Sequence, residues 1–152
     1  MRCGHWLEEE LLERRGTSPE EIRELFALVD RDLTVAAGED MVPDWQFIVA
    51  YQAALGLATV VLRATGYRTL GGAHHLITFD ALGEIAGPEQ APLVRYLQGA
   101  RAKRNAAEYR RAGQIDAAQA KELLSTTRRF RGWAIGWLQA HHPVLVPPGI
   151  GT

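Results

Sequence analysis

The side chains best suited to binding a phosphate group cluster on one predicted helix late in the chain. At about 100° per residue, the apolar face begun by Leu93 and Leu97 is continued by polar residues further along the helix. These residues carry two guanidinium groups, an amide and a phenol: Arg101, Arg104, Asn105 and Tyr109. Guanidinium groups bind the oxygens of a phosphodiester or nucleotide phosphate through charge-assisted hydrogen bonds. The spacing therefore indicates a phosphate-binding cleft.

The same polar face also fits a purely structural role. Charges in line with a core stripe must be paired or must face a cleft or a partner, because isolated buried charge is costly. In the structural alternative, Arg104 pairs with Glu108 four residues later. Asn105 and Tyr109 then hydrogen-bond to neighbouring helices. Periodicity alone favours this alternative, since structural ion-pair networks are common.

Two consecutive histidines lie at the start of another predicted helix. His74 and His75 face about 100° apart, so they are poorly placed to chelate one metal ion together. The single cysteine, Cys3, offers no second thiolate, and we predict neither a metal nor a cofactor. We interpret both histidines as core or surface residues. The alternative is that this helix end approaches Arg101 and Arg104 and supplies an imidazole.

Helical periodicity and capping signals predict six helices and no strand. Ser18 can cap the backbone N–H of Glu21, and Glu21 can reach back in a capping box. Asp116 and Gln119 predict a second capping box. The segment 67–72 is expected to be a loop. The expected helices cover about 4–14, 19–38, 43–65, 73–86, 89–112 and 117–142.

Length and composition limit the class of protein. The 152 residues suit one domain with a real core, and 17 basic against 18 acidic side chains exclude a generally basic nucleic-acid coat. Short loops between long helices predict a single all-α domain (1–152), an up-and-down bundle of about five to six helices, with its core over about 18–142 and a Pro/Gly-rich tail over 143–152. The charge-free stretch 45–62 is interpreted as a buried helix and not as a membrane span. With one cysteine and no export signal, we expect a cytoplasmic protein.

The late helix resembles the defining motif of the HEPN (higher eukaryotes and prokaryotes nucleotide-binding) superfamily. That motif is Arg-polar-x-x-x-His on a late helix of an all-helical bundle, and here the run is Arg104-Asn105-Ala106-Ala107-Glu108-Tyr109. The sequence matches at the arginine and the polar residue, and Tyr109 stands in place of the histidine. The resemblance to bacterial HEPN-like proteins extends to Ala50-Tyr51-Gln52-Ala53-Ala54-Leu55, Gly66-Tyr67-Arg68 and His74-His75, and covers about 18–142.

This resemblance implies a homodimer with a shared basic cleft. Members with the full motif are metal-independent ribonucleases, in which the arginine stabilises the strained phosphate and the histidine handles the proton of the 2′-hydroxyl. A phenol such as Tyr109 is a poor base near neutral pH unless nearby arginines lower its pKa. We therefore expect binding of nucleotide or RNA phosphate. The resemblance also implies a toxin–antitoxin or defence module and a nucleotidyltransferase partner. We expect no membrane association.

Two alternatives stay open. One is a catalytically silent dimeric interaction module whose polar cluster lies in the dimer interface. The other is a metal-independent endoribonuclease that uses Arg104 with Tyr109 or with a borrowed histidine.

Overall fold

The structure is a computed structural model that describes residues 2–72, 74–109, 113 and 115–151, without the side chains of Arg2, Glu108 and Tyr109. Helices make up most of this part, which confirms the predicted all-α helical bundle. The α-helices are α1 (Arg2–Glu8), α2 (Pro19–Ala36), α3 (Pro43–Ala64), α4 (His74–Ala86), α5 (Ala91–Tyr109) and α6 (Ala117–His141). Between and after them lie β1 (Leu12–Arg14), β2 (Tyr67–Thr69) and two 3-10 turns, η1 (Pro88–Gln90) and η2 (Pro143–Leu145).

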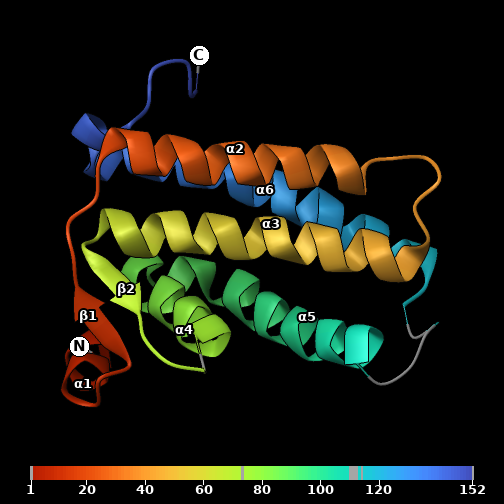
Figure 1. Cartoon of the computed structure of the whole chain (residues 1–152), viewed down its shortest axis with the longest axis horizontal. Coiled ribbons are helices and arrows are strands. Elements are labelled where there is room, and N and C mark those ends of the chain that lie inside the picture. The colour runs from red at the N-terminus through yellow and green to blue at the C-terminus, as the bar shows by residue number, and fades with distance from the viewer. Residues whose placement is uncertain (1, 73, 110–112, 114, 152) are drawn as a thin grey trace.

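The central element of the bundle is α3. It packs against α2 and α6 on one side and against α4 and α5 on the other (Figure 1). By length and composition α3 could cross a membrane, and 67% of its most apolar 18-residue window is buried inside the molecule. The charge-free stretch of the sequence thus forms the core helix, and all the longer helices of the bundle are positioned against it.

Capping residues set the helix starts as the sequence predicts. The Ser18 hydroxyl accepts a hydrogen bond from the Glu21 backbone N–H at 3.2 Å. Asp116 and Gln119 form the full capping box at the start of α6. The side chain of Glu21, however, does not complete the box predicted at the start of α2. It binds two arginines instead, because guanidinium groups from other elements offer charge-assisted hydrogen bonds.

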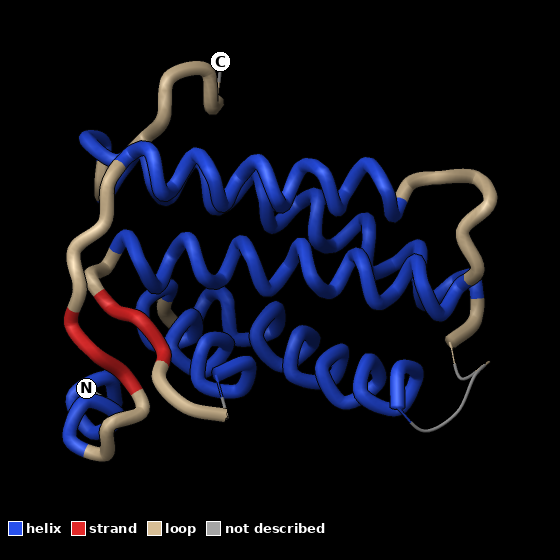
Figure 2. The backbone as a smooth tube through the Cα atoms, viewed as in Figure 1, coloured by secondary structure: helices blue, strands red, loops and turns tan. Residues whose placement is uncertain are grey.

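The two short strands were not predicted, and this part of the prediction is wrong. Helix α1 ends at Glu8, and Glu10, with φ of +58°, turns the chain. Leu12–Arg14 then pairs antiparallel with Tyr67–Thr69, which we expected to be a loop (Figure 2). Three-residue strands carry almost no periodic signal. They are stabilised by pairing with each other and by a small apolar cluster, which contains Cys3, Trp6, Leu12, Leu62, Tyr67, Ile77 and Ala81.

The start of α5 and the structure of the tail also differ from the sequence prediction. The helix expected from Glu89 begins at Ala91, because residues 88–90 form η1 after Gly87, which has φ of +89°. Its expected end near Ala112 lies outside the described residues. The tail contains η2 and then packs Val146 and Ile150 against the core.

Helices α2 and α3 approach each other closely at Gly56. A Cβ at this position would lie 2.8 Å from Val29 Cγ2, nearer than real Cβ atoms come to a neighbour. Glycine therefore permits this packing distance between the two helices.

Candidate phosphate-binding site

A cavity of about 430 Å³ lies between the start of α4 and the middle of α5. Helix α5 contributes the guanidinium and amide groups, and α4 with the residues before it contributes the opposite wall. The structure therefore brings three of the four predicted site residues to one cavity together with both histidines. Its lining consists of Gly72, His74, His75, Leu76, Arg101, Arg104 and Asn105.

The side chains on α5 are held in place by hydrogen bonds along that helix. Arg104 Nη1 donates to Asn105 Oδ1 at 3.2 Å, and Arg101 Nε donates to Gln98 Oε1 at 3.1 Å. Gln98 in turn donates from Nε2 to the carbonyl oxygen of Leu76 and to Asp80 Oδ1 on α4. This amide therefore joins the two walls of the cavity.

The buried base of the site is Tyr51 of α3. Its side chain is fully buried, and its hydroxyl lies 3.1 Å from His75 Nδ1. The guanidinium carbon of Arg104 lies 5.7 Å from the centre of the Tyr51 ring, within the range of a cation–π contact. Tyr51 therefore contacts the imidazole of His75 on α4 and the guanidinium group of Arg104 on α5. From the buried core it helps to position one side chain of each wall.

Burial and positive charge keep the imidazole of His75 neutral. Burial, then His74, Arg104 and Arg101, lower the pKa of His75 to about 4. Burial raises the pKa of Tyr51 to about 12, against a smaller opposite effect of the two arginines. At neutral pH the cavity therefore carries the charge of two guanidinium groups, a neutral imidazole and a protonated phenol.

Two residues of the predicted cluster cannot be placed in the cavity. Glu108 and Tyr109 belong to the end of α5, but their side chains lie outside the described part of the chain. The Arg104–Glu108 ion pair and the role of Tyr109 therefore stay predictions. After α5, the backbone N–H groups of Gly113 and Ile115 donate hydrogen bonds to Asp44, which connects this segment to α3.

Sequence reasoning missed Tyr51 and weighed His75 only as an alternative. Nothing distinguishes Tyr51 from its apolar neighbours in a charge-free stretch, because its polar contacts come from α4 and α5. Among the described residues, no three His, Cys, Asp or Glu side chains come together in a group that could hold a metal ion.

Comparisons of the chain with family models, with curated proteins and with solved structures find no match. The chemistry of the cavity therefore carries the functional argument. Two guanidinium groups, an amide and imidazole nitrogen can together bind an oxyanion.

Stability should fall as the pH is lowered through the range in which His75 titrates. The folded state holds the pKa of His75 near 4, whereas an unfolded chain has an ordinary value of about 6.5. The unfolded state therefore binds the proton more readily, so the stabilisation is complete above about pH 6.5 and is lost toward pH 4. We expect a loss of about 1–2 kcal/mol, allowing for solvent screening of a partly buried group.

Urea denaturation at several pH values between 7 and 4 measures this effect. His75→Asn should remove most of the slope. His142→Asn is the matched comparison, because the pKa of His142 is also lowered, and it should remove less. An unchanged slope in His75→Asn would contradict the assignment.

Proposed function

We propose that the cavity between α4 and α5 binds the phosphate of a nucleotide or of RNA, as in a HEPN-like protein. The observation that carries this proposal is that Arg101, Arg104 and Asn105 line one open cavity opposite His75. Two arginines with an amide offer several N–H donors to one phosphate.

The charge of the lining supports this choice of ligand. Among the described lining residues there are two arginines and no carboxylate. A phosphate in the cavity would offset this positive charge and accept hydrogen bonds from both guanidinium groups. Its negative charge would also raise the pKa of His75 from its low value, because two of the causes of that value are the arginines.

The proposal includes the setting that the HEPN resemblance implies. The protein would then act as a cytoplasmic homodimer in a toxin–antitoxin or defence module, beside a nucleotidyltransferase partner. The sequence motif at Arg104–Tyr109 supports this part.

A second candidate function is a metal-independent endoribonuclease. The imidazole of His75 supports it, because this side chain lines the same cavity as Arg104 and is held at Nδ1 by Tyr51. In such an enzyme His75 would move the proton of the 2′-hydroxyl and Arg104 would stabilise the charged phosphate. The phosphate of the bound RNA would first have to raise the pKa of His75, so that the imidazole becomes a stronger base.

Binding of a fluorescein-labelled single-stranded RNA and of ATP, followed by anisotropy and calorimetry over a salt series, tests the first proposal. Arg104→Gln should weaken binding about 10-fold, because it removes a charge-assisted contact with phosphate. Lys103→Gln removes the same charge from the exposed side of α5 and should have little effect. Equal losses in the two variants, or binding that Arg104→Gln leaves unchanged, would refute the proposed site.

The same proteins separate the other functions. Incubation with RNA in the absence of metal should show cleavage only if the endoribonuclease proposal holds, and His75→Asn and Arg104→Gln should each abolish it. An interaction module would bind no RNA, and Arg104→Gln would dissociate its dimer in size-exclusion chromatography.

A further inference from the structure

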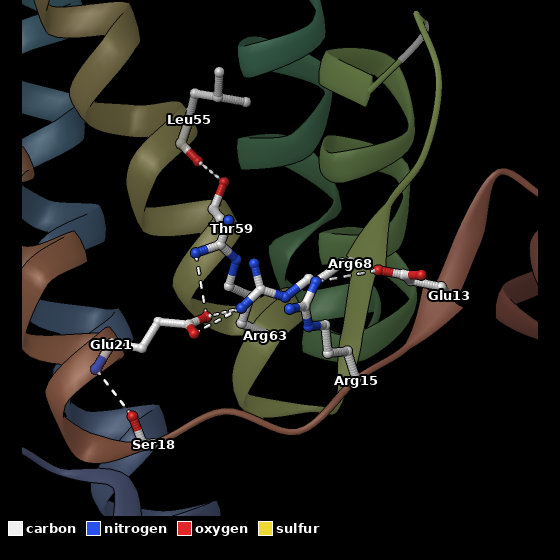
Figure 3. Close-up of polar contacts among 8 residues, drawn as sticks. All are labelled: Glu13, Arg15, Ser18, Glu21, Leu55, Thr59, Arg63 and Arg68. Atoms are coloured by element: carbon white, nitrogen blue, oxygen red, sulfur yellow. Dashed lines mark hydrogen bonds and ion pairs between the residues drawn. The ribbon is translucent and has the colours of Figure 1, made fainter.

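A second and larger cavity, of about 490 Å³, is lined by α2, α3 and the first turns of α4, with residues of both strands at one end. Its volume is within the range of small-molecule sites in proteins. The residues in line along α3 are Leu55, Thr59 and Arg63, which are four positions apart and so share one helix face (Figure 3). This face runs about 12 Å from an apolar end to a charged end.

At the charged end of the cavity, three arginines lie close to one partly buried carboxylate, that of Glu21. Arg63 Nη1 donates to Glu21 Oε1 at 3.2 Å, and Arg68 Nη2 lies 2.6 Å from both Glu21 oxygens. The guanidinium group of Arg15 lies nearby and has a 3.7 Å contact to Glu13 (Figure 3). Glu21 is therefore shared between cations from α3 and β2.

The hydrogen-bonding capacity of these arginines is not fully used. Arg68 Nε is buried and has no hydrogen-bond partner in the described part of the chain. Burial and the neighbouring Arg68 lower the pKa of Arg63, which shows that the guanidinium groups crowd one another. A further negative group at this end would relieve that repulsion.

The charges around the cavity leave one positive charge uncompensated. Leaving His74 aside, four guanidinium groups face three carboxylates. Arg15, Arg31, Arg63 and Arg68 line the cavity with Glu13 and Asp32, and the third carboxylate is Glu21, which is not in the lining but binds Arg63 and Arg68. A ligand with a single negative charge would therefore offset part of this positive charge.

Part of the remaining cavity wall is apolar, and it lies beside polar side chains such as those of Gln52, Thr59 and Thr78. Leu25 and Val29 of α2 face Leu55 and Leu62 of α3, and Leu28, which is 48% exposed, lies at the rim. Val29, Leu55 and Leu62 are already buried, so an apolar ligand body would cover mainly Leu25 and Leu28, and burying their surface favours binding.

We propose that this cavity binds a small organic monoanion with an apolar body, such as a medium-chain carboxylate. The anionic head lies among Arg15, Arg63 and Arg68, and the apolar body lies along Leu25 and Leu55. This site shares the lining residue His74 with the proposed phosphate-binding cavity, but it does not depend on the function proposed for that cavity.

Three probes of different chemistry test the proposal by calorimetry and by two-dimensional NMR of the whole chain. Octanoate carries both the anionic head and the apolar body, octan-1-ol carries only the body, and acetate carries only the head. Octanoate should bind at least about 10-fold more tightly than either of the others. Octan-1-ol that binds as tightly as octanoate would overturn the proposal, as would octanoate shifts centred on Arg104 instead of Thr59.

Matched variants locate the head of the ligand. Arg68→Gln should weaken octanoate binding about 10-fold, whereas Arg23→Gln, which removes an exposed charge from α2, should leave it unchanged. If Arg68→Gln does not fold, Thr59→Phe fills the cavity while leaving the arginines in place, and it should abolish octanoate binding but keep RNA binding. A folded variant of either kind that binds octanoate like the original chain would overturn the proposal.

Discussion

Tyr51→Ala should lower the free energy of unfolding by about 3–5 kcal/mol, as expected for loss of a fully buried aromatic ring. The ring packs edge-on against Phe79 at 5.9 Å between centres and also contacts the guanidinium group of Arg104. Its removal leaves a cavity in the middle of the bundle and takes away the support of the proposed phosphate-binding site. Urea denaturation followed by circular dichroism measures the change.

Tyr51→Phe separates the hydroxyl group from the ring. This variant keeps the packing but leaves His75 Nδ1 without its contact at 3.1 Å, so we expect a loss of only about 1–2 kcal/mol. It should also weaken RNA binding, because the imidazole loses its orientation. Equal destabilisation by the two variants would show that ring packing is not the main contribution of Tyr51.

Glu21→Gln should cost about 2–3 kcal/mol. The variant removes the charge that two guanidinium groups share, and these groups are only about one quarter exposed, with 27% for Arg63 and 22% for Arg68. Breaking a largely buried ion pair is costly because the remaining charges have no counterion. Glu24→Gln, at an exposed position on the same helix, should change stability by less than about 0.5 kcal/mol.

The Glu21 variant has a second expected effect, on ligand binding. With the competing carboxylate gone, the arginines are free to bind an added anion, so octanoate should bind more tightly and should restore part of the lost stability. The double variant Glu21→Gln/Arg68→Gln should be more stable than the Glu21→Gln variant, because it removes an unpaired cation. A double variant that loses the sum of both single effects would contradict the charge argument.

The main helices could be predicted because their signals are local. Ser18 and Asp116 cap α2 and α6 through contacts within one turn, and the apolar spacing of α2 and α6 gives their buried faces. The strand pair could not be predicted, because Leu12 and Tyr67 are far apart in sequence and each strand has only three residues. The contacts of Glu21 could not be predicted from the sequence either. Its position predicts a capping role, and only the folded chain brings Arg68 close enough to compete.

The candidate site was predictable on one helix only. Periodicity places Arg101, Arg104 and Asn105 on one face of α5, and the structure has them line one cavity. Which elements lie opposite them depends on how α3 and α4 pack. The contributions of Tyr51 and His75 could therefore be recognised only from the tertiary structure.

The close approach at Gly56 limits how the cavity proposed to bind a monoanion can evolve. Gly56 lies in the cavity lining, and a side chain there would meet Val29 Cγ2 at 2.8 Å, so the Val29 side chain would have to shift. Ligand preference can therefore diversify more easily at exposed lining positions, such as Leu28 and Arg31, than at position 56. Descendants of this protein that take different ligands should vary at the rim while position 56 stays glycine.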